Sequence, residues 1–158
     1  MIVTRAIVWI FLILVVGAIF ESPGGNISKA KKTTALATAT AIESAVNNFY
    51  TEYGVLPNVP AVVKTITPDG VELLTMLKGL EKSTAPRNIR AIKFLSVKEG
   101  KNGKNGLIFD PSGTSIVGLF DPWGNPYTVV LDQDDDKQIE VRRGSIAKTL
   151  RGRRVAAY

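Results

Sequence analysis

The chain has 158 residues, of which 45% are hydrophobic and 22% charged, and its formal net charge is +6. This length and composition predict a folded domain of ordinary size rather than a disordered polymer. The absence of cysteine and histidine excludes disulfides, cysteine-based metal or redox sites and histidine-dependent catalysis. We therefore assign no catalytic residue and expect a protein that is not an enzyme; paired carboxylates such as Asp132 and Asp134 are the only candidates for one.

An apolar run, "AIVWIFLILVVGAIF" at residues 6–20, dominates the N-terminus. A membrane span needs about 20 residues, and Ile2 and Val3 extend the run past Arg5, whose side chain can reach the interface. A cleaved signal peptide is the alternative, but residues 18–22, Ala-Ile-Phe-Glu-Ser, contain no good A-x-A pattern for a cleavage site. We expect residues 1–25 to form an uncleaved membrane-spanning segment.

A long amphipathic helix is predicted from Lys29 to Tyr53. Pro23 and the two glycines after it should kink or interrupt the helix before that point. Gly54 and Pro57 should end it. Its apolar face has spacings of three and four residues, and comprises Ala39, Ile42, Val46, Phe49 and Tyr53.

A second helix and a set of short strands follow. The helix should begin with Asp69 as N-cap, and its buried stripe should comprise Val71, Leu74, Leu77 and Leu80. The expected strands are "AIKFL", "GLIFD", "SIVGLF", "YTVVL", "QIEV" and "RVAAY", with a polar loop containing two Asn-Gly turns at residues 98–106. Residues 26–158 should therefore form one α+β domain with a long helix packed on a small antiparallel sheet.

The stretch "DPWGNPY" is an unusual loop because it combines two prolines with two aromatic residues. The motif residues are Asp121, Pro122, Trp123, Gly124, Asn125, Pro126 and Tyr127. We expect Asp121 to accept backbone N–H bonds, and Gly124 and Asn125 to tolerate positive φ. Trp123 and Tyr127 should cover the end of the core; an exposed aromatic binding loop is the alternative. A related "FDPSG", eleven residues before "FDPWG", suggests a repeated turn.

Positive charge is concentrated after residue 141. The basic residues there are Arg142, Arg143, Lys148, Arg151, Arg153 and Arg154, with no acid among them, and they equal the whole net charge. A solvated basic region, a contact for an acidic partner and a contact for anionic lipid all remain open. Nucleic acid is not an expected partner because no aromatic residue interleaves the arginines.

These features resemble type IV pilin-like proteins, and in particular the major, G-type pseudopilin of bacterial type II secretion systems. The resemblance rests on "AIESAVNNFYTEYGVLP" (residues 41–57), on "DPWGNPY" and on the same order of elements over nearly the whole chain. It implies a pilin-like fold and a structural subunit of a pseudopilus that exports proteins.

The resemblance also implies a location and partners. The chain would cross the bacterial inner membrane once, with its globular domain in the periplasm. It would associate with itself through the N-terminal helices, with other pseudopilins, with inner-membrane components of the secretion system and with membrane lipid. A non-polymerising, membrane-anchored periplasmic adaptor or binding protein is the alternative function.

Two family features bear on processing and on metal binding. The leader glycine and early glutamate of the family have no counterpart before Glu21, which leaves cleavage by prepilin peptidase open. The family binds calcium near its C-terminus, and here Asp132, Asp134 and Asp136 are spaced for Ca²⁺, whose preferred ligands are oxygens. An acidic hairpin turn that binds no metal is the alternative.

Overall fold

The computed structural model describes residues 23–158, so the apolar run at residues 6–20 lies outside the described residues. The chain divides into two units, Met1–Thr33 and Thr34–Tyr158. Helix α2, Pro23–Tyr53, is continuous through Gly24 and Gly25. Contrary to the expectation, the glycine pair does not interrupt the helix. Within the described part of the chain, no helix is sufficiently long and apolar to cross a membrane.

The expected apolar face of α2 is confirmed within the second unit. Ile42, Val46 and Phe49 are buried, with Ala39 at one end of the stripe and Tyr53, half-buried, at the other. The ring of Phe49 lies 4.7 Å from that of Tyr53 and 5.6 Å from that of Phe94, centroid to centroid. The helix therefore supplies one whole side of the main core.

The second helix, α3 (Pro68–Leu77), follows the short strand β1 (Val62–Lys64). Its N-cap is Thr67, whose hydroxyl accepts the Gly70 N–H, so the prediction of Asp69 as N-cap is wrong. Pro68 occupies the first helical turn, where its missing N–H costs nothing. Leu74 and Leu77 are buried as expected, whereas Leu80 lies beyond the helix end and is exposed.

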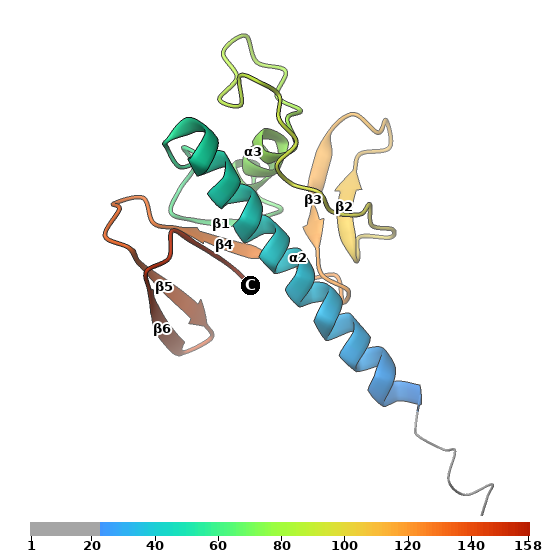
Figure 1. The fold of residues 1–158 in the computed structure, drawn as a ribbon. Helices are drawn as coiled ribbons and strands as arrows, with labels where there is room; N and C mark the ends of the chain where they lie inside the picture. The colour runs from blue at the N-terminus through green and yellow to red at the C-terminus, as the bar shows by residue number, and fades with distance from the viewer. Residues whose placement is uncertain (1–22) are drawn as a thin grey trace, which may run out of the picture. The chain divides into compact units, whose positions relative to one another are not determined.

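The remaining strands form three small antiparallel sheets rather than the single sheet expected (Figure 1). The strand orders are β1-β4-β7, β2-β3 and β5-β6. The bounds are Gly106–Phe109 for β2, Ile116–Phe120 for β3, Thr128–Leu131 for β4, Gln138–Arg143 for β5, Ile146–Arg151 for β6 and Val155–Ala157 for β7. The α+β class is confirmed, and β1 and β6 are strands that the sequence analysis missed.

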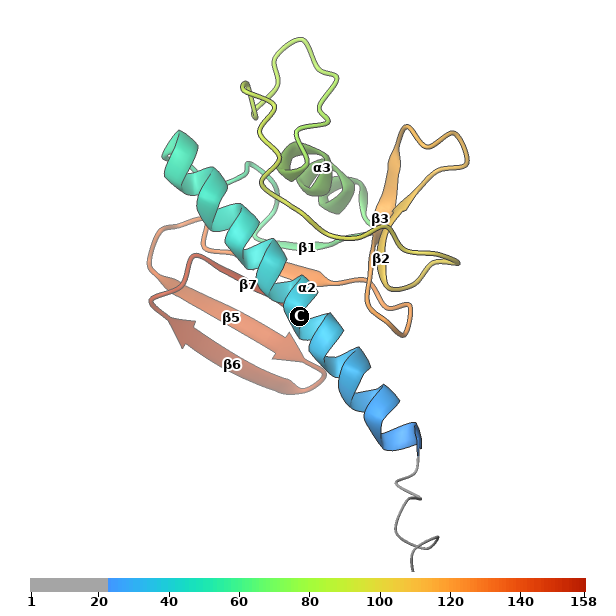
Figure 2. The same cartoon turned by 45° about the vertical axis from the view of Figure 1, so that its right-hand side comes forward.

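The central β1-β4-β7 sheet has a different neighbour on each face. Val63 and Val129 pair across one face and belong to the main core with α2. Val130 and Ala156 pair on the opposite face and form a second buried cluster with Ile139 of β5. The β5-β6 hairpin thus covers the face of the sheet that α2 does not (Figure 2).

The segment "AIKFL", residues 91–95, is not a strand, contrary to the expectation. The buried Asn88 organises this region instead. Its side-chain amide donates to the carbonyl oxygens of Met76 (2.8 Å) and Ile92 (2.7 Å), and its side-chain oxygen accepts the Ile92 N–H (3.0 Å) and the Tyr53 hydroxyl (2.7 Å). Since these bonds bind the loop to α2 and α3, Leu95 reaches the core without strand pairing.

We predict that Val46→Asp lowers the free energy of unfolding by at least about 3 kcal/mol, because it buries a charge without a partner. Thermal melting of the purified chain, followed by circular dichroism, measures this effect. Asn48→Asp places the same charge on the exposed side of the helix and serves as the control. A folded Val46→Asp chain with the melting temperature of the control would contradict the prediction.

Candidate functional site

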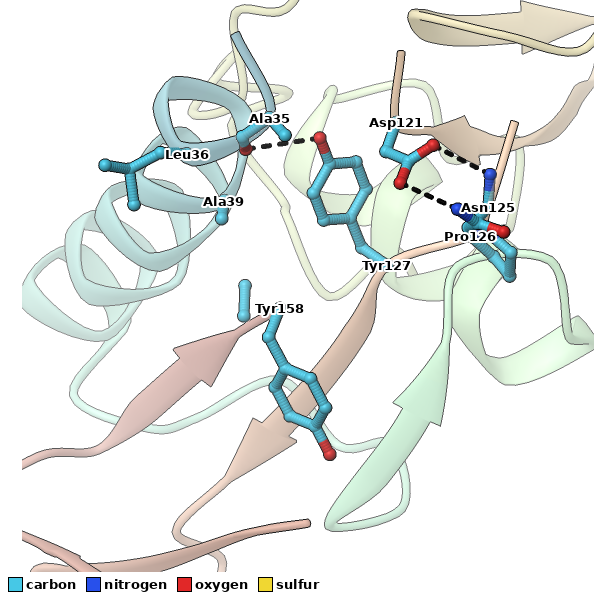
Figure 3. A pocket seen from close by; sticks show the side chains of 9 residues that line it. Ala35, Leu36, Ala39, Asp121, Asn125, Pro126, Tyr127 and Tyr158 are labelled. Carbon is cyan, nitrogen blue, oxygen red and sulfur yellow. Dashed lines mark hydrogen bonds between the residues drawn. The ribbon is translucent and has the colours of Figure 1, made fainter. Parts of the chain in front are cut away.

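The Asp121–Tyr127 turn joins β3 to β4 and is held by one carboxylate. Asp121 accepts the backbone N–H groups of Trp123 and Asn125, both at 2.8 Å, and the Asn125 side-chain amide at 3.0 Å. Figure 3 shows the two bonds from Asn125 to this carboxylate. Gly124 adopts φ +97°, which confirms the expected positive φ at this position. The turn is therefore closed by Asp121 as the sequence predicts.

The environment of Asp121 has two opposing effects on its pKa. Partial burial raises the pKa, whereas the hydrogen bonds from Asn125, Trp123 and Gly124 stabilise the ionised form and lower it. The hydrogen bonds have the larger combined effect, so the pKa lies below its ordinary value. The ionised carboxylate contributes stability that is fully present above its ordinary pKa and is lost as the pH falls from there through the lowered pKa of the folded chain.

The earlier Asp-Pro turn repeats the same geometry. Asp110 accepts the backbone N–H groups of Thr114 and Ser115, both at 2.9 Å. In each turn the N–H of a glycine with positive φ donates to the aspartate carbonyl: Gly113 to Asp110 at 2.8 Å, and Gly124 to Asp121 at 3.1 Å. The expected repetition of one turn around β3 is confirmed.

Tyr127 is the buried aromatic residue of the motif, with 4% of its surface exposed. Its hydroxyl donates to the Ala35 carbonyl of α2 at 3.2 Å (Figure 3). Its N–H donates to the hydroxyl of Thr65 at 3.0 Å, and the Thr65 hydroxyl donates to the Leu119 carbonyl at 2.6 Å. Tyr127 and Thr65 thus link α2, the end of β1 and β3.

Trp123 does not cover the core, which corrects the prediction for this residue. It is 44% exposed, whereas Tyr127 is buried as expected. The Trp123 N–H and the Asn125 N–H point into the turn toward Asp121, whereas the backbone of Tyr127 pairs with Thr65. Trp123 is therefore the exposed aromatic residue of the loop, as in the alternative interpretation, and Tyr127 is the residue that covers the end of the core.

An open groove of about 430 Å³ lies between α2, the turn and the C-terminus. It is lined mainly by apolar groups, among them Leu36, Ala39, Pro126, Tyr127 and Tyr158 (Figure 3). Leu36 is 69% exposed at its rim. The groove holds no cluster of nucleophile and base, so its chemistry suits apolar contact rather than catalysis.

The acidic loop between β4 and β5 brings the three expected aspartates together. One carboxylate oxygen each from Asp132, Asp134 and Asp136 lies within 4.8 Å of the other two. Asp132 is only 3% exposed and accepts the N–H groups of Asp136 (3.2 Å) and Lys137 (2.9 Å). Lys137 has φ +60°, a conformation that favours glycine, although the sequence has lysine there.

The electrostatics of this loop are unfavourable for three charges. Burial raises the pKa of Asp132, and the neighbouring Asp134 and Asp136 raise it further. A divalent cation would offset that repulsion, and three carboxylates supply oxygen ligands of the kind that Ca²⁺ prefers. The three carboxylates are therefore of the ligand type that calcium prefers. Asp132 is held in place by hydrogen bonds from the backbone, whereas Asp134 and Asp136 are exposed. Calcium binding stays a prediction.

The last two arginines of the basic tail contact α2. The Arg153 guanidinium lies 3.4 Å from the carboxylate of Glu43, and that of Arg154 lies 4.2 Å from the ring centroid of Tyr50. Glu43 also accepts the Ala157 N–H of β7 at 3.0 Å. The sequence analysis did not identify Glu43, Thr65 and Asn88, whose side chains form hydrogen bonds between separate elements. For Glu43, the sequence feature that could have indicated this role is an acidic residue next to the apolar face of a helix.

Comparisons of the chain with protein-family models, with curated proteins and with solved structures found no match. The candidate site therefore rests on its own geometry: an ordered turn, an apolar groove beside α2, and an acidic loop.

We predict different costs for the two aromatic residues of the turn. Tyr127→Ala should lower the free energy of unfolding by about 3–5 kcal/mol because it leaves a cavity in the core. Trp123→Ala should change it by no more than about 1 kcal/mol, since the residue is 44% exposed and lies outside the main core. Chemical denaturation of both variants beside the parent chain measures the difference. Equal losses for the two would place Trp123 in the core and contradict the structure.

We also predict a calcium-dependent rise in stability. A cation bound only to the folded form adds about 2.7 kcal/mol at a hundredfold excess over Kd. The melting temperature should rise with added Ca²⁺, fall with chelator, and become insensitive in Asp134→Ala. Asp110→Ala removes an aspartate from a different turn and should keep the calcium response. Identical melting of the parent chain with Ca²⁺ and with chelator would establish an acidic turn without metal.

Proposed function

We propose that this chain is a membrane-anchored, pilin-like structural subunit of a pseudopilus that serves type II protein secretion. One observation carries the proposal. Helix α2 runs for 31 residues, but only its later part is covered by the rest of the chain. Residues 25–33 are all exposed, and the apolar run at residues 6–20 precedes them in the sequence.

That division suits a subunit that is held in place by its helix. The buried stripe from Ala39 to Phe49 fastens α2 to the folded unit. The exposed part carries the large apolar side chains Ile27 and Leu36, which the described chain leaves in solvent. Exposed apolar groups on a helix gain free energy when a second helix covers them. Subunits would stack through their N-terminal helices, with the globular part in the periplasm.

The proposed role is mechanical, so it needs no catalytic residue. The described chain contains no histidine or cysteine, and its carboxylate cluster lies in a turn without a neighbouring base. The described chain has two turns that are each ordered by an aspartate side chain, Asp110 and Asp121. Rigid turns are what a fibre subunit requires if force is to pass through the domain without unfolding it.

A membrane-anchored adaptor that does not polymerise is the second candidate. The observation that favours it is the apolar groove beside α2, together with the exposed ring of Trp123. An adaptor would bind a partner at this groove as a single copy. The two functions differ in whether chains meet one another through their N-terminal segments.

We expect disulfide crosslinking between N-terminal segments to separate these functions. The natural chain has no cysteine, so one introduced by Ile13→Cys is the only thiol present. Oxidation of native membranes should give crosslinked dimers of Ile13→Cys, in amounts that fall when unlabelled parent chain dilutes it. Thr84→Cys, in an exposed loop of the folded unit, is the matched control and should stay monomeric.

Two results would contradict the proposal. Release of the chain from membranes by carbonate would rule out the anchor. Retention in the membrane without any crosslinking at Ile13→Cys or at neighbouring positions of the apolar run would favour the adaptor.

A further inference from the structure

The β5-β6 hairpin separates charge along its length. The acidic loop with Asp132, Asp134, Asp135 and Asp136 precedes its base, whereas Arg142, Arg143 and Lys148 lie around its turn. Each strand has six residues, so the hairpin is about 20 Å long at 3.3 Å per residue. That length exceeds the screening distance of about 8 Å at physiological salt. A surface that contacts the turn therefore experiences mainly the basic residues.

Some of the basic residues of the C-terminal region form ion pairs within the chain. Arg142 pairs with Glu140 at 2.5 Å, and Arg153 pairs with Glu43. Lys148 and Arg151 are exposed and take part in no ion pair with the described residues. The hairpin consequently presents cations that the fold does not need.

An apolar side chain stands at the tip, near Lys148; Arg151 lies at the opposite end of the hairpin, where it pairs with Gln138. Ile146 is 72% exposed, which is the largest exposed fraction among the large hydrophobic residues of the described chain. It pairs with Arg143 across a two-residue turn, in which Gly144 adopts φ +62°. The turn is short and closed by strand pairing, so Ile146 is held out from the body of the unit.

The turn and the acidic loop lie at opposite ends of the hairpin (Figures 1 and 2). The end that carries the turn and Ile146 is therefore the end from which the acidic loop is absent.

We propose that the tip of the β5-β6 hairpin docks on an anionic lipid surface, with Ile146 in the interfacial layer and the basic side chains beside it on lipid phosphates. This inference rests on the proposed function, because it requires a membrane beside the unit. Each cation near such a surface strengthens binding about fivefold, and burial of one isoleucine adds about tenfold. Docking would fix the tilt of the globular unit over the membrane.

The composition of the hairpin favours lipid over the other acidic partners. Surfaces that bind single-stranded nucleic acid combine cations with aromatic rings that stack on bases, and residues 137–151 contain no aromatic residue. The acidic side chains of a protein partner would contact the cations of the hairpin, but such side chains would not cover the exposed Ile146. An acidic bilayer interface accommodates both.

The test uses the whole chain reconstituted in vesicles. Ser145→Cys places the only thiol in the turn for an environment-sensitive fluorophore, and Thr84→Cys carries the same label in the exposed loop after α3. That loop lies far from the hairpin in both views (Figures 1 and 2). With phosphatidylglycerol in the vesicles, the Ser145 probe should shift to the blue and be quenched by spin-labelled lipid. Vesicles of phosphatidylcholine alone, or high salt, should remove the shift, and the Thr84 probe should respond to neither.

Variants then identify the side chains responsible. Ile146→Ser and Lys148→Glu, each added to the Ser145→Cys chain, should weaken the lipid response about tenfold and at least fivefold, respectively. Lys82→Glu makes the same charge change in the far loop and should leave it unaltered. Circular dichroism verifies that the hairpin variants keep the fold.

The outcomes separate this inference from the proposed function. A chain that carbonate releases from the vesicles refutes the anchor. A chain that stays in the bilayer while the Ser145 probe is silent, or responds equally to both lipids, refutes hairpin docking alone. A probe that responds only to soluble polyglutamate would show that the tip binds an acidic protein, and would also overturn the proposal.

Discussion

Burial of one face of α2 is the constraint on which the rest of the structure depends. None of the sheets is large: one has three strands of three or four residues, and the other two are hairpins. Isolated two-stranded hairpins are marginally stable in water. The side chains from Ile42 to Phe49 supply the surface against which the β1-β4-β7 sheet and the β2-β3 hairpin lose their contact with water, whereas the β5-β6 hairpin packs on the other face of the central sheet. The helix is therefore the organising element, and the sheets depend on it.

Buried polar residues then decide how the pieces fit around that helix. The three in the described chain are Thr65, Asn88 and Asp132, and each lies at a junction between elements. Thr65 joins the end of β1 to β3 and Tyr127; Asn88 joins the loop after α3 to Tyr53 of α2. Because a buried polar group without partners is costly, each of these residues permits essentially one local arrangement. They provide specificity where apolar contacts alone would allow several packings.

The sequence predicted those features that depend on neighbours along the chain. The face of α2 follows from its spacing, and the turns at Asp110 and Asp121 follow from Asp-Pro and glycine chemistry; all are confirmed. The prediction from sequence failed where contacts with residues far away in the sequence determine the local conformation. "AIKFL" has strand composition, but the bonds of Asn88 to Met76 and Ile92 hold its loop in another conformation.

The candidate site shows the same division. The closeness of the three aspartates was predictable from alternating positions in one loop. The exposure of Trp123 was not, because aromatic composition predicts burial without saying which of two rings is turned inward. Tyr127 takes that place because its backbone pairs with Thr65, a residue far away in the sequence. The groove beside α2 likewise needs Tyr158 from the C-terminus, which no local pattern connects to residue 35.

The arrangement also divides a single helix into an exposed part and a part that is buried in the folded unit. The stripe that stabilises the unit ends at Ala39, and Leu36, one turn earlier, is already in solvent. A change among residues 25–33 alters an exposed surface, whereas a change in the stripe from Ala39 to Phe49 alters the core. A subunit that stacks through its helix benefits from this division, because contacts between copies can vary without loss of stability. The C-terminal tail strengthens the boundary, since Glu43 and Tyr50 engage Arg153 and Arg154 only on the folded side of it.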